Sequence, residues 1–214
     1  MIPKAVFFDM DGTLIDSEPL WFENEVKLMA QFDYEWGALD QSNTIGGPIE
    51  KVGKYMSACV LGVNTPEFFA ESLISMVSSD FESRLVFMPG ALELLHSLSE
   101  IGMKLALVSA SPRQMLEATF RRLEGKYFEL LVSKDDVVNP KPDPECYLKA
   151  AEFFGVSPSD CLILEDSLTG VLSAKASGAK VVAIPHFVEI LADDQVVVIA
   201  TLKAMKLESL FSLH

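Results

Sequence analysis

The chain has 214 residues, half of them apolar, which suits one large domain or one domain that contains a smaller insert. Its formal net charge of -14 disfavours nucleic acid and anionic membrane surfaces as partners, although a metal or a few focused cations can still attract an anionic small molecule. No apolar run reaches the roughly 18 residues that a membrane span needs, and no secretory signal pattern precedes the first apolar run. We therefore expect a cytoplasmic protein with no obligate protein partner, and we expect reduced core cysteines at Cys59, Cys146 and Cys161.

Short continuous apolar runs predict buried strands, and amphipathic patterns between them predict helices. The predicted strands are AVFF (5–8), KLALVS (104–109), FELLVS (128–133), CLILED (161–166), KVVAI (180–184) and VVVIA (196–200). The predicted helices between them lie within residues 90–102, 111–125, 143–155 and 167–178. In the third of these, Asp143 can cap the helix and Pro144 can occupy its first position. The alternation indicates an α/β fold, a Rossmann-like doubly wound and mostly parallel sheet covered on both faces.

The region between the first and second of these strands breaks this rhythm. Residues 16–86 hold no convincing buried strand but carry three helical patterns, within residues 18–32, 48–60 and 65–77. We therefore predict an α/β core made of residues 1–15 and 87–214, and an α-helical domain of residues 16–86 inserted after the first strand.

Polar residues stand at or just after the carboxyl ends of the predicted core strands, where ligands bind in open parallel sheets. They are Asp9 and Asp11 after the first strand, Ser109 after the second, Glu165 and Asp166 after the fourth, and Lys141 in NPKPDP ahead of a helix. In an extended chain, residues 9 and 11 would point to the same side, with Met10 pointing away. Carboxylates gathered on one edge repel each other without a cation. An all-oxygen ligand set favours a hard divalent ion, and Mg²⁺ is the cellular default.

These motifs resemble those of the haloacid dehalogenase superfamily of phosphotransferases. The resemblance rests on DMDGT (9–13), VSAS (108–111), KPDP (141–144) and EDS (165–167), in the order that this family has. The insert resembles the helical cap of its subfamily I. The stretch FDMDGTLIDSE (8–18) is most similar to the group that contains β-phosphoglucomutases and sugar-phosphate phosphatases.

The resemblance implies a role for each motif residue. Asp9 would attack phosphorus and form an aspartyl-phosphate, and Asp11 would protonate the leaving oxygen and then activate water. Ser109 and the backbone N–H of Ala110 would hold phosphate oxygens. Lys141 would offset charge on Asp9 and on the transferring phosphoryl group.

The resemblance also implies a metal site. Asp9, the main-chain oxygen of Asp11, and Asp166 would hold Mg²⁺, with Glu165 as a direct ligand or as support for the ligands. The helical insert would close over the site and select the leaving group.

The sequence therefore predicts a Mg²⁺-dependent phosphatase that acts on a small phosphorylated metabolite, a sugar phosphate. One alternative is a phosphomutase of the β-phosphoglucomutase type. Such mutases carry an Arg in a G-x-x-R stretch of the cap, whereas GGPIEKV (46–52) has Ile49 there, unless Lys51 replaces it. Another alternative is a non-catalytic phospho-acceptor that resembles response-regulator receivers. A third alternative is that Asp9 and Asp11 form a turn or helix-cap pair with no catalytic role, because Asp-Gly is a common turn signal.

Overall fold

The computed structural model describes residues 2–45, 47–186 and 188–212. By internal contacts the chain divides into two compact units. The core unit consists of Met1–Asp16 and Leu85–His214, and the insert unit consists of Ser17–Arg84. None of the helices in the described ranges combines the length and the apolar content that a membrane crossing requires.

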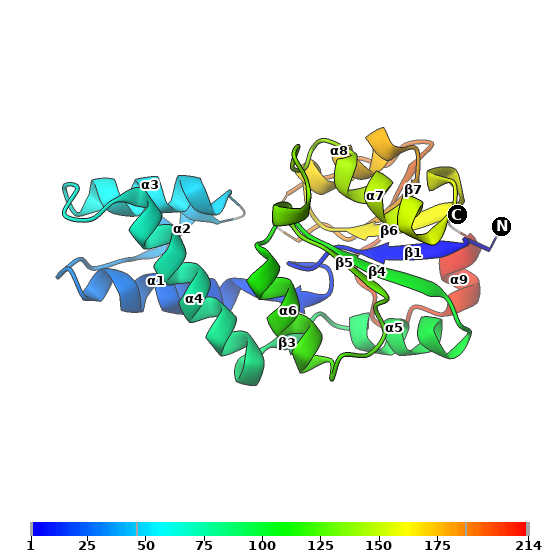
Figure 1. Ribbon diagram of the computed structural model, residues 1–214, viewed down its shortest axis with the longest axis horizontal. Helices are drawn as coiled ribbons and strands as arrows, with labels where there is room; N and C mark the ends of the chain where they lie inside the picture. Colours follow the sequence, from blue (N-terminus) through cyan, green and yellow to red (C-terminus); the bar gives the residue numbers. More distant parts are fainter. Residues whose placement is uncertain (1, 46, 187, 213–214) are drawn as a thin grey trace. The chain divides into compact units, whose positions relative to one another are not determined.

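A six-stranded sheet forms the centre of the core unit, and all its neighbouring strands are parallel (Figure 1). The strand order is β5-β4-β1-β6-β7-β8. The strands are β1 (Ala5–Phe8), β4 (Lys104–Val108), β5 (Leu130–Val132), β6 (Cys161–Glu165), β7 (Lys180–Ala183) and β8 (Val196–Val198). Strands β4 and β5 lie on one side of β1, and β6, β7 and β8 lie on the other, so the chain changes direction across the sheet beside β1. This arrangement confirms the doubly wound fold class predicted from the alternating pattern.

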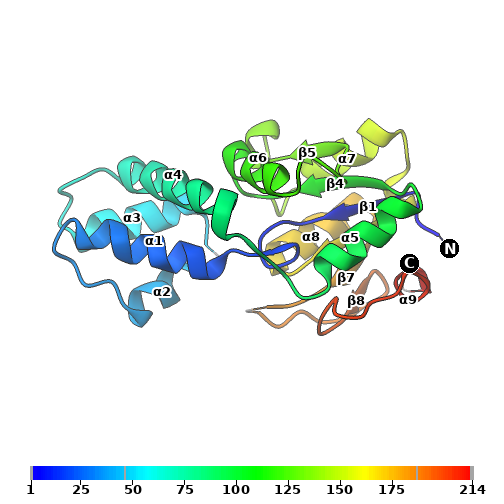
Figure 2. The same cartoon turned by 90° about the horizontal axis from the view of Figure 1, so that it is seen from below.

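Helices cover both faces of this sheet (Figures 1 and 2). Helices α7 (Glu145–Phe154) and α8 (Leu168–Ser177) lie on one face, and α5 (Ala91–Glu100) and α6 (Arg113–Arg122) lie on the other. A short C-terminal helix, α9 (Leu207–Ser212), contacts α5. The unit also contains two 3₁₀ turns among its described residues, η1 (Lys134–Asp136) and η2 (Pro158–Asp160).

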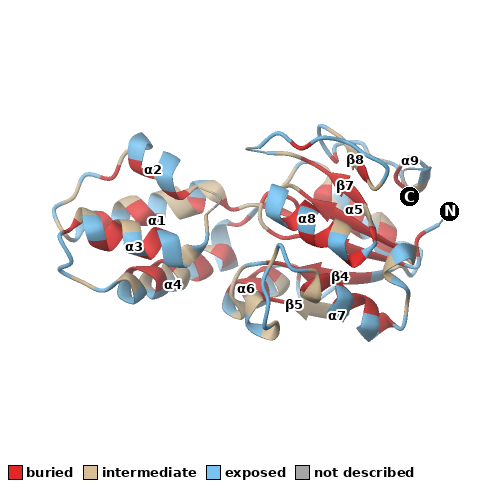
Figure 3. Ribbon diagram, turned by 90° about the horizontal axis from the view of Figure 1, so that it is seen from above, coloured by how far each residue is buried: buried red, intermediate tan, exposed pale blue. Residues whose placement is uncertain are grey.

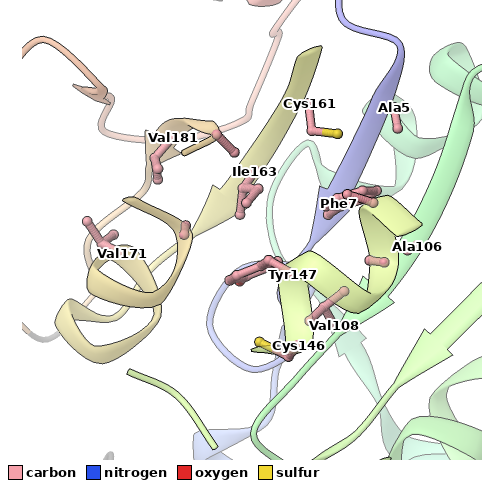
Figure 4. Packing of buried hydrophobic residues seen from close by; sticks show 14 of the residues in the cluster. Ala5, Phe7, Ala106, Val108, Cys146, Tyr147, Cys161, Ile163, Val171 and Val181 are labelled. Carbon is pink, nitrogen blue, oxygen red and sulfur yellow. The ribbon is translucent and has the colours of Figure 1, made fainter. Parts of the chain in front are cut away.

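The central strands are buried from end to end, apart from exposed Lys104 at the start of β4 (Figure 3). Burial on both faces explains why these strands appear in the sequence as continuous apolar runs. One large hydrophobic cluster lies between the sheet, α7 and α8, and its members include Phe7, Val108, Tyr147, Ile163 and Val171 (Figure 4).

Helix α7 begins one residue later than predicted. Pro144 precedes the first helical residue, Glu145, and therefore does not occupy the first helical position. Pro144 takes the cap position that was predicted for Asp143, but Asp143 still satisfies an N–H at the helix start, because its Oδ1 accepts the backbone N–H of Glu145 at 3.0 Å. Gly155 ends the helix in the left-handed conformation, with φ +63°, as its position in the sequence predicted.

The two chain segments that flank the insert pair with each other. Strand β2 (Ile15–Asp16) runs antiparallel to β3 (Val86–Phe87), with Ile15 opposite Phe87 and Asp16 opposite Val86. The expectation of no convincing buried strand in residues 16–86 is not contradicted, because the two ladder residues in that range are half-buried (Asp16) and exposed (Val86). Two-residue strands carry no readable period, and Val86 is exposed, so no apolar pattern marked them.

The described residues of the insert unit form four helices: α1 (Glu18–Ala30), α2 (Ala38–Thr44), α3 (Ile49–Cys59) and α4 (Pro66–Arg84). Helix α4 packs against α1 and α3 around buried residues that include Leu28, Met29, Met56, Phe69 and Leu73. Helix α2 was not predicted. Its residue Asp40 accepts hydrogen bonds from the hydroxyls of Tyr34 and Tyr55, both at 3.0 Å, and from the N–H of Gly37 at 2.9 Å.

Candidate active site

The sheet register brings the predicted residues to one edge. Phe8 of β1 lies opposite Leu107 of β4 and Leu164 of β6, so the next residue, Asp9, lies between Val108 and Glu165. The backbone N–H of Asp9 donates to Leu164 O at 3.0 Å, which extends the ladder by one step. Because the strands are parallel, their polar carboxyl ends meet here.

A tight turn follows Asp11, which forms an isolated bridge with Ile15. The carbonyl of Met10 accepts the N–H groups of Leu14 and Ile15, at 2.9 and 3.0 Å, so the chain leaves the strand directly after Asp9. The expectation that Asp9 and Asp11 point to the same side stays a prediction, and Met10 between them is fully buried. Gly12 has φ +79°, and a Cβ there would lie 2.2 Å from Asp166 Oδ2, so both the backbone angle and the space require glycine.

Lys141 lies at the centre of the site, with only 4 % of its side chain exposed. Its Nζ donates to Asp9 Oδ1 at 2.8 Å, to Glu165 Oε1 at 2.7 Å and to Val108 O at 3.1 Å. Burial lowers the pKa of this ammonium group, but the carboxylates of Asp9 and Glu165 raise it, and the net result is a pKa well above the usual value. Lys141 is therefore a permanent cation beside the predicted nucleophile.

Glu165 is fully buried, and both of its carboxylate oxygens are occupied by protein donors. Oε1 accepts from Lys141 Nζ at 2.7 Å and from the Tyr147 hydroxyl at 2.9 Å. Oε2 accepts from the backbone N–H groups of Asp166 and Ser167, at 3.1 and 3.2 Å, and from Ser167 Oγ at 3.1 Å. A carboxylate with five protein donors acts as a fixed anchor for the groups around it.

Two serines that follow β4 turn towards Asp11. Ser111 Oγ donates to Asp11 Oδ2 at 2.7 Å, and Ser109 Oγ donates more weakly to the same oxygen at 3.4 Å. Ser109 Oγ also accepts the backbone N–H of Ser111 at 3.0 Å, while Ala110 between them is exposed. The predicted phosphate-binding segment and the predicted acid–base residue thus form one hydrogen-bonded group.

Carboxylate oxygens of Asp9, Glu165 and Asp166 all lie within 4.8 Å of one another. Burial, followed by the charge of Glu165, raises the pKa of Asp9 to about 8, although Lys141 lowers it. Burial, followed by the charge of Asp9, raises the pKa of Asp166 to about 9. The single positive charge of Lys141 does not balance the negative charge of three neighbouring carboxylates. Their oxygen atoms are the ligands that a hard divalent cation such as Mg²⁺ prefers.

Three residues at this site received no role from the sequence. Ser111 stands inside the VSAS motif, which was the available signal for its contact with Asp11. Tyr147 belongs to the buried face of α7, and its hydroxyl meets Glu165, 18 residues further along the chain. Gly170 touches the same carboxylate, since a Cβ on it would lie 1.7 Å from Glu165 Oε1. Periodicity marks Tyr147 as buried but does not reveal which group its hydroxyl meets.

The sequence matches the haloacid dehalogenase-like hydrolase family over residues 6–184. Hexitol phosphatase B of Escherichia coli (strain K12) is 34% identical over 185 residues, which cover 85% of this chain and 83% of that protein. The bifunctional riboflavin kinase/FMN phosphatase of Arabidopsis thaliana is 30% identical over 187 residues, 86% of this chain but only 49% of that protein, so the chain spans about half of its length.

Among solved structures, the crystal structure of a candidate β-phosphoglucomutase from Thermotoga maritima superposes with a TM-score of 0.81 at 28% identity, covering 99% of this chain and 100% of that one. The family match extends from β1 to the end of β7 and includes all four motifs described above. These findings confirm the resemblance inferred from the motifs, and the chain belongs to the haloacid dehalogenase-like hydrolase family.

Proposed function

We propose that the chain is a Mg²⁺-dependent phosphatase that hydrolyses a small phosphate monoester, a sugar or sugar-alcohol phosphate, through an aspartyl-phosphate on Asp9. The observation that carries this proposal is the buried contact of Lys141 with both Asp9 and Glu165, at 2.8 and 2.7 Å, beside the carboxylate of Asp166. The names of the two curated relatives, a hexitol phosphatase and an FMN phosphatase, support the reaction class.

Asp9 attacks phosphorus, while the cation of Lys141 offsets the charge of the nucleophile and of the transferring phosphoryl group. Asp11 gives a proton to the leaving oxygen and later takes one from the attacking water. The hydroxyl of Ser111, 2.7 Å from Asp11 Oδ2, orients that carboxylate. Ser109 and the backbone N–H of Ala110 hold the phosphate oxygens, which requires the Ser109 hydroxyl to turn from Asp11 to the substrate.

Asp9, Asp166 and the main-chain oxygen of Asp11 would hold Mg²⁺. Glu165 supports these ligands without binding the ion directly, since its two oxygens already accept five hydrogen bonds from the protein. When bound there, Mg²⁺ would supply positive charge that offsets the phosphoryl oxygens and the three carboxylates.

The phosphomutase remains the second candidate, favoured by the similarity to the Thermotoga maritima structure. Ile49, at the position where the mutases carry an Arg, is partly buried against the hydrophobic cluster of the insert unit. An apolar side chain packed in this way offers no charge for a second phosphate. Gly46, the first residue of the G-x-x-R alignment, lies outside the described residues. The family assignment disfavours the receiver-like alternative.

We further propose that the enzyme works in the cytoplasm on a phosphorylated metabolite. All three cysteines are free, and two of them, Cys146 and Cys161, are buried. Unpaired buried thiols are typical of a reducing compartment.

A phosphate-release screen with Mg²⁺ tests the function. The substrates are hexose phosphates, hexitol phosphates, FMN, phosphoglycolate and β-glucose 1-phosphate with a bisphosphate primer. We expect release of inorganic phosphate from at least one sugar or sugar-alcohol phosphate. Conversion of β-glucose 1-phosphate to glucose 6-phosphate without net phosphate release would establish the mutase instead. No release from any substrate, together with no phosphoenzyme, would reject both candidates.

A further inference from the structure

We propose that Tyr147 is a positioning residue for Lys141: its buried hydroxyl shares Glu165 Oε1 with the lysine ammonium and so keeps that ammonium on Asp9. The inference rests on the proposed function, because it concerns the cation that faces the transferring phosphoryl group. It starts from a side chain that the proposed reaction steps leave without a role.

Tyr147 contacts both members of the Lys141–Glu165 pair. Its hydroxyl donates to Glu165 Oε1 at 2.9 Å, and Lys141 Nζ lies 4.8 Å from the centre of its ring. The face of an aromatic ring attracts a cation at this distance. Tyr147 therefore meets the lysine through its ring and the lysine's partner through its hydroxyl.

The hydrophobic core fixes the position of that hydroxyl. Tyr147 is fully buried on α7 within the cluster that includes Phe7, Val108 and Ile163 (Figure 4). On the other side, Glu165 has no room to move, because Gly170 contacts its carboxylate directly and Ser167 holds Oε2. The hydrogen bond thus joins two groups that the surrounding fold holds in place, whereas Lys141 reaches Oε1 through a long side chain with several rotatable bonds.

Lys141 has no spare donor. An ammonium group has three hydrogens, and in this site they point to Asp9 Oδ1, Glu165 Oε1 and Val108 O. The two carboxylates therefore compete for one cation. The Tyr147 hydroxyl reduces the charge that Glu165 Oε1 presents to Lys141, which favours the contact between Lys141 and Asp9.

Removing the hydroxyl leaves Oε1 with Lys141 as its one side-chain donor. We expect the ammonium to move towards Glu165 and away from Asp9, since Glu165 and the ring of residue 147 stay fixed. The charge that Lys141 offsets is greatest in the transition state of phosphoryl transfer. The displacement therefore slows the chemical step more than it weakens binding of the substrate.

The test compares Tyr147→Phe with the parent enzyme by rapid-quench measurement of phosphoenzyme formation from p-nitrophenyl phosphate, whose leaving group needs little protonation. Loss of one hydrogen bond to a charged group predicts a rate about tenfold lower, with KM changed less than about twofold. The affinity for tetrafluoroaluminate, a planar mimic of the transferring phosphoryl group, should fall by the same factor. The affinity for inorganic phosphate should not.

Ser173→Ala is the matched control. Ser173 Oγ donates to Asp143 O at 2.7 Å and lies 3.6 Å from Cys146 Sγ, so it supports the same segment while the five donors of Glu165 stay in place. We expect this variant to lower Tm without slowing phosphoenzyme formation. Equal slowing in both variants would mean that general loosening explains the effect, and it would overturn the inference.

The same measurements distinguish failure of the proposed function from failure of the role proposed for Tyr147. A parent enzyme that forms no phosphoenzyme overturns the proposed function and this inference together. A parent that forms it, with Tyr147→Phe reacting at the parental rate, overturns the inference alone. If Tyr147→Phe does not fold, 3-fluorotyrosine at position 147 replaces it, because its hydroxyl is a stronger donor. The expected result is then faster phosphoenzyme formation, and an unchanged rate overturns the inference.

Discussion

Gly170→Ala is a substitution for which helix propensity and the structure predict opposite signs. Gly170 lies in the first turn of α8 (Leu168–Ser177), and its N–H donates to Ser167 Oγ at 3.0 Å. Alanine is normally favoured over glycine inside a helix by roughly 1 kcal/mol. In this protein the added methyl would lie 1.7 Å from Glu165 Oε1 and 2.2 Å from Oε2, far inside contact distance.

The steric cost outweighs the gain in propensity. Glu165 is fully buried and cannot move aside without losing hydrogen bonds on at least one of its oxygens. Two lost hydrogen bonds to a charged group cost about 3 kcal/mol at the low end, and overpacking adds about 1 kcal/mol. After subtraction of the propensity gain, we expect a net destabilisation of about 3 kcal/mol, or a fall in Tm of roughly 6–12 °C for a chain of this size.

Thermal unfolding followed by circular dichroism, together with kcat at saturating Mg²⁺, would measure both effects. Because Glu165 also holds Lys141, we expect kcat to fall along with Tm. The matched control is Gly37→Ala, where the added Cβ meets nothing within 4 Å and φ is −129°. Because Gly37 is the N-cap of α2 and alanine is a poorer N-cap than glycine, this control should cost no more than about 1 kcal/mol and should leave kcat unchanged. A Gly170→Ala protein as stable and as active as the parent would refute the reasoning from the Glu165 contact.

Three further predictions concern the carboxylates. Asp9→Asn should fold normally yet lose turnover and phosphoenzyme, because an amide is a poor nucleophile; turnover within about tenfold of the parent by phosphate release would remove Asp9 from that role. EDTA should stop activity and Mg²⁺ restore it, and Asp166→Ala should raise the Mg²⁺ concentration needed for half-maximal rate; full activity in EDTA would contradict a metal requirement. Asp11→Asn should slow phosphoenzyme formation from sugar phosphates by roughly 10²–10⁴-fold but from p-nitrophenyl phosphate much less, with a burst of nitrophenolate in rapid-quench kinetics; equal losses for both substrates would assign the acid–base role elsewhere.

Hydrophobic patterns in the sequence predicted the buried strands of the core sheet and the residues at the ends of those strands. The buried strands appear as continuous apolar runs, and strand ends that share one edge brought Asp9, Ser109 and Glu165 into one prediction. Helix α4 shows the opposite case, because its pattern predicted residues 65–77 whereas the helix continues to Arg84. Its last turns are polar apart from Phe81, and Arg84 pairs with Asp80 at 3.0 Å and with Glu23 at 2.7 Å, a contact 61 residues away.

Helix α2 was missed for a similar reason. The sequence ALDQSNT has no apolar stripe, and its Asp40 is held by Tyr34, Tyr55 and Gly37, none of which belongs to the helix. In the site, the motifs predicted which residues lie close together. They did not predict that Lys141 donates to both Asp9 and Glu165, or that Tyr147 also donates to Glu165. The distinction between Glu165 as a ligand and Glu165 as an anchor depends on Tyr147 and Ser167 hydroxyls, whose directions only the folded chain defines.

The short β2–β3 ladder means that the core keeps the same chain geometry whatever lies between its two strands. With Ile15 opposite Phe87 and Asp16 opposite Val86, the point where the chain departs and the point where it returns are one strand spacing apart. A loop whose ends are already joined can change in length at little entropic cost. A change in the number of residues between Ser17 and Arg84 therefore leaves the two ends of the insert joined at the same place on the core unit.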